Sequence, residues 1–563
     1  MKFNNLVKLS SIMLVVLSLI ALSFLSACGE PEPEQPSPSP TPSPSPTQEQ
    51  PSPSPTQEQP SPSPTQEQPS PSPTTSPDAE KYGGILKIGH TSETGIVALG
   101  YPPNMAGTID GYQSETCLDT LFTYDKTTKL VPRLATGFKV SDDATSVTIT
   151  LREGVKFHDG SDFNAEVCKW NLMNYRDSAQ KELDAITSID IVDDYTIKLN
   201  LSEYDSTVVG LLAEDPGRMI SQAAFEANGA EWCEKHPVGT GAFKLVSWEP
   251  DVIIKYERFD DYWQEGLPYL DGVERIFYAD ATTALMAFQN GDCDILNNCG
   301  ALTAKQLEDT GKYNIVSALY GRQPMLSGDS IHEDSPYHDI RVRQALSYAI
   351  DIPTLADSLS YGYAKVTDQW ALPGSQYYND DLEPITYNPD KARQLLADAG
   401  YADGFDTDYY FLGTSWATPR CTAVAAYLEQ VGIHATLKPL MLAGYDPVAS
   451  EAGWEGGLVE ILTFARPELL DSMKPICEHN SIKFVSMARP DGYEDKFVEA
   501  LTATDPDVKS AAVREMAKMA RDFSMNTCFY VEGEVSAKHL YVHDSLWAEQ
   551  AMGYLNPACW MEK

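Results

Sequence analysis

Residues 388–400 read NPDKARQLLADAG and contain every signal of a complete α-helix. Asn388 is a capping residue type, Pro389 suits the first helical position, and Gly400 ends the pattern. The apolar residues between them fall on one face: Ala392, Leu395, Leu396 and Ala399. The stretch therefore predicts a helix that is buried along one side.

Other helices and strands are predicted outward from this stretch. A second one-sided helix follows Asp339. Apolar residues alternate with polar ones at 147–151 and 197–201, 252–256 is a β-branched run, and 85–89 follows two glycines. No period of 20 to 50 residues occurs after residue 80, which argues against a solenoid. The sequence predicts a mixed α/β fold.

The N-terminus predicts export. Lys2 and Lys8 precede an apolar run, 12–22, that is too short to span a bilayer and is typical of a signal peptide. The run leads to Leu25-Ser26-Ala27-Cys28, which resembles the lipobox of bacterial lipoproteins. We expect Cys28 to carry acyl chains, which would anchor the mature chain stably. The alternative is a plain secretory signal with an incidental cysteine.

Residues 29–80 contain no Lys or Arg, and the unit PSPSPTQEQ recurs there with a nine-residue period. Such a segment cannot bury enough apolar surface to offset its chain entropy. In polyproline II conformation it would reach on the order of 160 Å. It is predicted to be a stalk; a segment that binds cell wall or an SH3-type domain is the alternative.

The charge balance excludes one class of partner. The chain has 41 Lys+Arg against 81 Asp+Glu, a formal net charge of −40. This charge repels a phosphate backbone, so no nucleic-acid partner is expected. The folded body is itself acidic, which favours solubility and cationic or neutral ligands.

Seven further stretches lie in an order that resembles a known family. They are 83–88, 131–135, 151–160, 236–243, 261–263, 341–346 and 387–393. The family is bacterial extracellular solute-binding protein family 5, the binding lipoproteins of oligopeptide, dipeptide and nickel ABC importers. Taken one by one, the stretches are turn and strand signals that identify the scaffold.

The resemblance implies an α/β, two-lobed periplasmic-binding-protein-like fold of type II, the Venus flytrap, with an extra subdomain on lobe I. Two strands would cross between the lobes, near 320–326 and 527–535. The implied division is a signal peptide and lipobox at 1–28, the stalk at 29–80, lobe I at 81–322 with an insertion at about 115–235, lobe II at 323–526, and a return to lobe I at 527–563.

The resemblance also implies a function. The chain would capture a peptide-like or other organic solute between its lobes and deliver it to an ABC permease, with ATP hydrolysis in a separate subunit. It would work as a monomer, without a cofactor, anchored by lipid to the outer face of the bacterial cell membrane. A nickel-chelate or oligosaccharide cargo is the alternative within this fold.

An enzyme is the alternative of another class, namely a surface-anchored hydrolase. The sequence has no His-Glu-x-x-His, Gly-x-Ser-x-Gly or Cys-x-x-Cys motif. We therefore expect no enzyme and no catalytic residue.

Histidines and cysteines give no clear site. His539 and His543 fall on a predicted strand, where their spacing is too wide for one metal ion, so no metal site is expected. Besides Cys28 there are nine cysteines, an odd number outside the cytosol, so at least one should stay free or pair between molecules. Cys293 and Cys299 are close enough for a local bridge, but no connectivity can be deduced.

Aromatic residues and one arginine are the candidates for ligand contact, because flat rings stack on peptides and sugars and a guanidinium pairs with a carboxylate. The resemblance places them toward the lobe interface: Tyr320, Arg322, Tyr361, Trp370, Trp416, Tyr445, Trp454 and Trp560.

The anchor for a peptide amino group departs from the family pattern. Peptide binders of this family carry an Asp four residues before a proline; here Thr463 holds that place before Pro467, and Glu460 replaces an aromatic residue. Glu460 or Glu468 could take over the anchor. The departure predicts poor binding of ordinary di- and tripeptides, and a modified peptide, a glycan-derived or another organic solute as cargo.

Overall fold

The computed structural model describes residues 80–91, 98–105, 113–477, 483–545 and 555–562. They belong to a compact unit that spans Thr74–Lys563. The predicted signal segment, Cys28 and nearly all of the predicted stalk lie outside the described residues.

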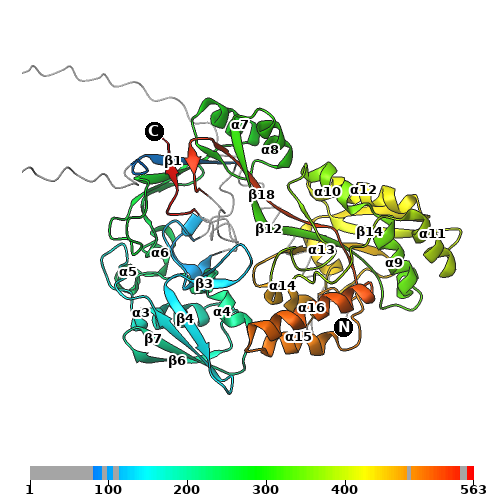
Figure 1. Ribbon diagram of the computed structural model, residues 1–563, viewed down its shortest axis with the longest axis horizontal. Coiled ribbons are helices and arrows are strands. Elements are labelled where there is room, and N and C mark those ends of the chain that lie inside the picture. Colours follow the sequence, from blue (N-terminus) through cyan, green and yellow to red (C-terminus); the bar gives the residue numbers. More distant parts are fainter. Residues whose placement is uncertain (1–79, 92–97, 106–112, 478–482, 546–554, 563) are drawn as a thin grey trace, which may run out of the picture. The chain divides into compact units, whose positions relative to one another are not determined.

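A mixed sheet of twelve strands organises this unit (Figure 1). Ten strands follow the order β15-β14-β16-β12-β18-β11-β1-β10-β9-β8, while β13 pairs with β18 and β17 pairs with β12. The strands are β1 Ile85–His90, β8 Phe243–Glu249, β9 Ile253–Arg258, β10 Gly272–Phe277, β11 Ile295–Leu296, β12 Tyr313–Gly328, β13 Lys365–Val366, β14 Phe405–Leu412, β15 Ile433–Leu440, β16 Leu458–Phe464, β17 Thr527–Cys528 and β18 Tyr530–His539.

Strands β12 and β18 carry this sheet from one half of the unit to the other. They run antiparallel from the pair Tyr313 and His539 to the pair Arg322 and Glu532, with an irregularity between Ser317 and Gly321. Beyond it, β12 pairs with β16. We call the half around β1 lobe I and the half around β14 lobe II, joined at this crossover (Figure 1).

Lobe I combines its share of the large sheet with a separate four-stranded sheet of order β4-β5-β7-β6, against which α3 lies. Alternating buried residues of the small sheet form its core. The remaining elements of lobe I are β2 Phe122–Tyr124, β3 Leu130–Pro132, β4 Ala135–Val140, β5 Ser146–Leu151, β6 Ile186–Asp193, β7 Thr196–Leu201, β19 Val542–His543, β20 Trp560–Met561, the 3₁₀ turns η2 Pro102–Asn104 and η3 Asp215–Gly217, and the helices α3 Ala165–Arg176, α4 Thr207–Leu211, α5 Gln222–Asn228, α6 Ala230–Lys235, α7 Ala281–Asn290 and α8 Ala301–Glu308.

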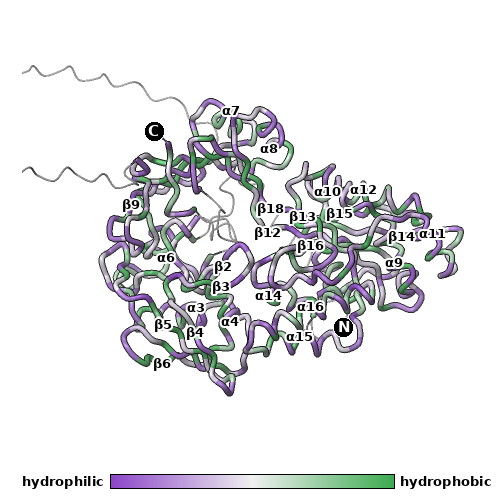
Figure 2. Tube along the Cα trace, in the orientation of Figure 1, coloured by the Kyte–Doolittle hydropathy of each residue, from purple (hydrophilic) through white to green (hydrophobic). Residues whose placement is uncertain are grey.

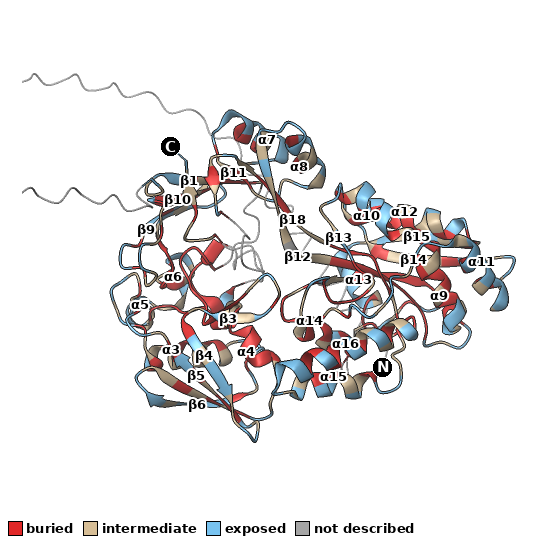
Figure 3. Cartoon of the chain, viewed as in Figure 1, coloured by how far each residue is buried: buried red, intermediate tan, exposed pale blue. Residues whose placement is uncertain are grey.

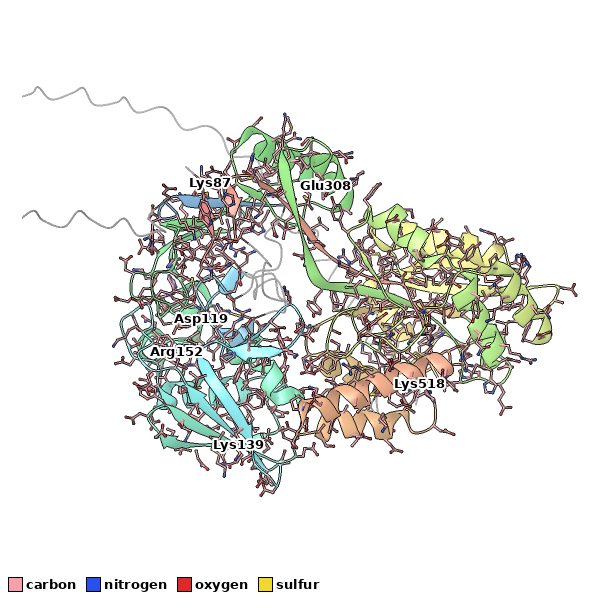
Figure 4. The ribbon with its side chains drawn as sticks, viewed as in Figure 1. Lys87, Asp119, Lys139, Arg152, Glu308 and Lys518 are labelled. Carbon is pink, nitrogen blue, oxygen red and sulfur yellow. The ribbon has the colours of Figure 1, made fainter. Side chains whose placement is uncertain are left out.

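Buried Asp119 ties together three stretches that carry the family resemblance, and a fourth stacks on one of them. It accepts hydrogen bonds from Arg133 Nε at 2.8 Å, Thr240 Oγ1 at 3.1 Å and Trp263 Nε1 at 2.8 Å. The guanidinium of Arg152 stacks over Trp263 at 4.4 Å; Figure 4 labels Asp119 and Arg152. Because a buried carboxylate needs such partners, these stretches serve the scaffold of lobe I.

Lobe II has parallel strands at its centre, with β14 between β15 and β16. Helix α16 shows why its helices pack: one face is buried and the other is exposed, as Figure 3 shows. The other elements are the 3₁₀ turn η4 Pro336–His338, α9 Ile340–Ala349, α10 Ile352–Ser360, α11 Pro389–Asp398, α12 Ala417–Glu429, α13 Leu442–Val448, α14 Leu469–Cys477, α15 Tyr493–Thr502 and α16 Pro506–Asp522.

The predicted elements are confirmed with one exception: the strand expected to carry both His539 and His543 is interrupted, because β18 ends at His539 and β19 begins at Val542. The 388–400 stretch forms α11, and Asn388 Oδ1 accepts a hydrogen bond from the Lys391 amide at 3.0 Å. Asp339 caps α9 in the same way through the Arg341 amide. The predicted strands become β1, β5, β7 and β9, and both predicted crossovers fall on β12, β17 and β18.

Within the described residues, no helix combines the length and the apolar character needed to cross a membrane. Figure 2 agrees, because hydrophilic and hydrophobic stretches alternate along the coloured chain.

Candidate functional site

One edge of the lobe II sheet lies where β12 enters the lobe. Strands β14 and β16 are parallel, and their carboxyl ends, Leu412 and Phe464, reach this edge. Arg322 of β12 is opposite Phe464, and α12 begins just after β14. Ligands of open α/β sheets bind outside the carboxyl ends of the strands. We call this region the crossover edge.

A small pocket opens beside the crossover edge. Thr128 contributes to it from lobe I and Tyr320 from the crossover itself, so the pocket lies between the lobes. Its lining is mainly aromatic and aliphatic, with one cationic side chain, Arg466. The lining residues are Thr128, Tyr320, Trp370, Ala371, Leu372, Ser375, Tyr377, Ala465, Arg466 and Leu469. This crossover pocket brings together two of the predicted ligand residues, Tyr320 and Trp370.

A charged and aromatic group, the Arg322 cluster, lies on strands β12 and β18. The guanidinium of Arg322 stacks over Trp416 at 4.9 Å, and its Nε is 3.7 Å from Glu532 Oε2. Burial raises the pKa of nearby Glu534, and the positive charge of Arg322 opposes that rise. The cluster joins two more predicted ligand residues, Arg322 and Trp416.

Glu460 is held inside lobe II by an arginine. Its two carboxylate oxygens accept hydrogen bonds from Arg420 Nε and Nη2, both at 2.8 Å, and the side chains are only 2% and 1% exposed. Tyr445 donates a hydrogen bond to the backbone oxygen of Glu460 at 2.7 Å. The carboxylate of Glu460 is therefore neutralised by the protein itself.

Glu468 is likewise occupied. Both of its carboxylate oxygens accept hydrogen bonds from Lys509 Nζ, at 3.0 and 2.9 Å, in a buried pair. Thr463 donates its hydroxyl hydrogen bond to the backbone oxygen of Gln323 at 3.2 Å. Glu460 and Glu468, the two carboxylates that could replace the peptide anchor, are therefore both paired with a cation of the protein itself.

The other predicted ligand residues lie apart from the crossover edge. Tyr361 follows α10 and is 41% exposed, whereas Trp454 is fully buried in a hydrophobic core of lobe II. Trp560 stacks on His543 at 4.1 Å in lobe I. Whether any of the predicted residues contacts a ligand stays a prediction.

Sequence reasoning missed the charged partners at the crossover edge, chiefly Arg420, Arg466, Glu532 and Glu534. Arg420 could have been found, because it lies four residues after Trp416 on one helix face. The two glutamates could not, since their proximity to Arg322 depends on the pairing of β12 with β18.

The lobes also touch directly, through residues outside the crossover strands. The amide of Ser206 donates a hydrogen bond to the backbone oxygen of Leu501 at 2.7 Å, and Lys474 Nζ is 2.7 Å from Asp205 Oδ2. Gln376 Nε2 donates to the backbone oxygen of Thr128 at 2.9 Å. These contacts hold lobe I against lobe II beside the crossover pocket.

Glu214 joins this contact and carries an unusual pKa. Burial raises the pKa of its carboxyl to about 7, although Arg466 Nη1, 3.4 Å away, lowers it. The nearby acids Asp471, Asp215 and Glu468 raise it further. Between about pH 4.5 and about pH 7, Glu214 therefore keeps a proton in the folded chain that it would release in the unfolded chain.

This proton predicts a pH-dependent stability. Since the folded pKa lies above the unfolded value, ionising Glu214 costs stability as pH rises from about 4.5 to about 7. We expect Glu214→Gln to melt at a higher temperature than the wild type at about pH 8, with the difference shrinking toward about pH 4.5. Differential scanning fluorimetry across this range tests the prediction, and a difference that is the same at every pH would contradict it.

The described residues show no metal site and no disulfide. All nine described cysteines are free, so the local bridge considered for Cys293 and Cys299 is not formed. No group of three described His, Cys, Asp or Glu side chains could hold a metal ion. The Nε2 atom of His539 instead lies 3.0 Å from the backbone oxygen of Phe288.

Several solved structures share this fold. HbpA2 from Haemophilus parasuis superposes with a TM-score of 0.76 at 19% identity, over 85% of this chain and 100% of that chain. NikA from Brucella suis, in complex with Fe(III)-EDTA, superposes with a TM-score of 0.72 at 20% identity, over 84% of this chain and 99% of that chain. DppA from Helicobacter pylori, in complex with the peptide STSA, superposes with a TM-score of 0.66 at 20% identity, over 86% of this chain and 99% of that chain. At these identities the likeness establishes the two-lobed binding-protein fold.

Sequence comparison finds nearer relatives. The glutathione-binding protein GsiB of Escherichia coli O157:H7 is 35% identical over 327 residues, which are 56% of this chain and 62% of the relative. The protein of the same name from Pectobacterium atrosepticum is 37% identical over 361 residues, 59% and 70% of the two chains. The chain thus spans less than two thirds of the E. coli relative.

The family model described as "Bacterial extracellular solute-binding proteins, family 5 Middle" matches residues 129–457, more than half of the chain. The matched segment runs from β3 of lobe I, through the crossover strand β12, to the start of β16 in lobe II. The chain belongs to the bacterial extracellular solute-binding proteins of family 5.

Proposed function

We propose that this chain captures a peptide-like organic solute between its lobes, outside the cytoplasm, and delivers it to the permease of an ABC importer. The observation that carries the proposal is the crossover edge, where an interlobe pocket and the Arg322 cluster meet the strands that join the lobes. Ligand closure about such strands is a known motion of two-lobed binding proteins. The division into lobe I at 81–322, lobe II at 323–526 and a return at 527–563 is part of this proposal.

Two comparisons support this class of cargo. The relatives named above bind glutathione, a modified tripeptide, and one structural neighbour holds a tetrapeptide. Among the described residues no metal-ligating group supports a bare metal ion as cargo. We therefore place a modified peptide first, ahead of a metal chelate or an oligosaccharide.

The internal ion pairs support a modified rather than an ordinary peptide. A buried ammonium needs a carboxylate partner. Glu460 and Glu468 are already paired with Arg420 and Lys509, and Thr463 carries no charge. A free peptide amino terminus would find no unpaired carboxylate at these three positions.

Native mass spectrometry of the purified protein tests the proposal by showing which solute it carries. Calorimetry then compares glutathione with unmodified tripeptides on protein stripped of that solute. We expect a carried organic solute, and glutathione bound more tightly than the unmodified tripeptides. Micromolar binding of unmodified peptides that is lost when their amino termini are blocked would contradict the proposed cargo.

Lipid anchoring at Cys28 completes the proposed localisation, with the segment 29–80 as the tether. Two or three acyl chains would bind the membrane stably, at roughly 0.8 kcal/mol per buried methylene. Cys28→Ala is expected to release the protein into the medium, which immunoblots of cell and medium fractions measure. Full membrane retention of the variant would refute the lipid anchor.

A further inference from the structure

We propose that Arg322 and Glu532 bind an α-amino-acid group of the solute, with Arg322 taking its carboxylate and Glu532 its ammonium. The inference rests on the proposed function and names the chemical group that the crossover edge recognises. Such a group carries both charges on one carbon, as in a γ-glutamyl compound, unlike the amino terminus of an ordinary peptide.

The two side chains lie opposite each other on the joining strands. Arg322 and Glu532 are register partners of β12 and β18, which places both on one face of the sheet. Phe464 is the register partner of Arg322 on its other side and is 49% exposed. A solute at the crossover edge would therefore meet a cation and an anion side by side, next to an open aromatic ring.

Arg322 and Glu532 do not form a hydrogen bond with each other. The 3.7 Å between Arg322 Nε and Glu532 Oε2 is too long for a hydrogen bond. Both atoms are buried and lack a hydrogen-bond partner within the described part of the chain. Leaving a charged donor and a charged acceptor without hydrogen bonds is costly, so each of the two groups can take a further partner.

Each group still has a face that a solute can reach. The side chains of Arg322 and Glu532 are 36% and 24% exposed. Trp416 stacks against the guanidinium face, which fixes its plane while leaving its donor edge for a planar carboxylate. The arrangement thus presents a fork of donors on one side and a carboxylate on the other.

The local charge favours a zwitterion over a simple anion. Glu534 lies two residues from Glu532 along β18, so the cluster holds one arginine and two glutamates. The neighbouring Arg420 and Glu460 cancel each other. A ligand with only a carboxylate would face two glutamates and leave Glu532 without a partner, and a ligand with only an ammonium would leave the guanidinium of Arg322 without a partner.

Calorimetry with four probes tests the assignment. The probes are glutathione, an analogue without the α-carboxylate (4-aminobutyryl-Cys-Gly), an analogue without the α-amino group (glutaryl-Cys-Gly), and Ala-Cys-Gly. We expect the wild type to bind glutathione at least about thirtyfold more tightly than either analogue, which is a typical loss for one desolvated charge contact.

Two variants link each charge to its residue. Arg322→Gln should weaken glutathione binding by at least about thirtyfold, yet change the affinity for the analogue without the carboxylate by no more than about threefold. Glu532→Gln should weaken glutathione binding by the same factor, yet change the affinity for the analogue without the amino group by no more than about threefold. Arg322→Lys keeps the charge without the fork and should fall between Arg322→Gln and the wild type. Lys438→Gln, which removes a partly exposed cation of β15 in lobe II, is the matched control and should bind as the wild type does. Melting curves verify that each variant is folded.

The outcomes separate this inference from the proposed function. Equal binding of glutathione and both analogues, or equal losses for all probes in the variants, overturns the assignment. A carried solute without an α-amino-acid group overturns the assignment and leaves the proposed function standing. A protein that carries no solute and binds none of the four probes contradicts both.

Discussion

Arg420→Met is expected to lower the free energy of unfolding by about 3–5 kcal/mol, because it leaves the carboxylate of Glu460 buried without a cation. The native pair has two hydrogen bonds of 2.8 Å and almost no solvent exposure. The thiol of Cys421, 3.2 Å from Glu460 Oε2, is too weak a donor to replace the guanidinium. Urea unfolding followed by tryptophan fluorescence measures the loss.

A surface cation provides the control. Lys518 pairs with Asp522 at 2.9 Å on α16, but both side chains are about half exposed or more, so Lys518→Met should destabilise the chain far less than Arg420→Met does. Replacing both buried partners, as Arg420→Met with Glu460→Met, should recover most of the loss, because no charge is then left unpaired. Equal losses for Arg420→Met and Lys518→Met would show that the pair is not buried as described.

Gly533→Ala is expected to destabilise the chain by about 1–3 kcal/mol through overpacking of the crossover. A Cβ atom at Gly533 would overlap the backbone oxygen of Ala318 and lie 3.2 Å from that of Tyr320. Backbone atoms cannot rotate away as a side chain can, so β12 and β18 would have to separate where they join the lobes. Urea unfolding measures the loss, and calorimetry should show weaker solute binding.

Gly137 is the matched control for this substitution. It also lies in a strand, β4, but a Cβ atom there would meet nothing within 4 Å. Gly137→Ala should be neutral or slightly stabilising, because alanine reduces the entropy of the unfolded chain. A similar change in the free energy of unfolding for both substitutions would contradict the role of Gly533 in close packing at the crossover.

Local signals predicted the elements of this fold well, because caps and periodicity act within a few residues. The residues that begin and end α11 are all contained in residues 388–400, and the structure uses Asn388 as its cap. The family motifs extended this to the two-lobed architecture of the fold. They also marked segments that meet at Asp119, although that meeting point is visible only in the structure.

The candidate site was less predictable, because its charges are set by distant partners. Nothing in the sequence around Glu460 shows that Arg420, forty residues earlier, neutralises it. Nor does the sequence show that Glu532 lies beside Arg322, since their pairing depends on the register of two strands far apart in the chain. Trp454 looked like a ligand residue but is buried by the packing of a hydrophobic core.

The proposed function requires a solute to be captured between the two lobes. Spin labels at positions 139 and 518 report on it, because Lys139 on β4 of lobe I and Lys518 on α16 of lobe II are exposed and lie outside the crossover edge (Figure 4). Pulsed electron paramagnetic resonance gives the distribution of distances between the labels with and without the solute that the protein carries. We predict a shorter and narrower distribution when the solute is bound. The same distribution in both samples at saturating solute would contradict capture of the solute between the lobes.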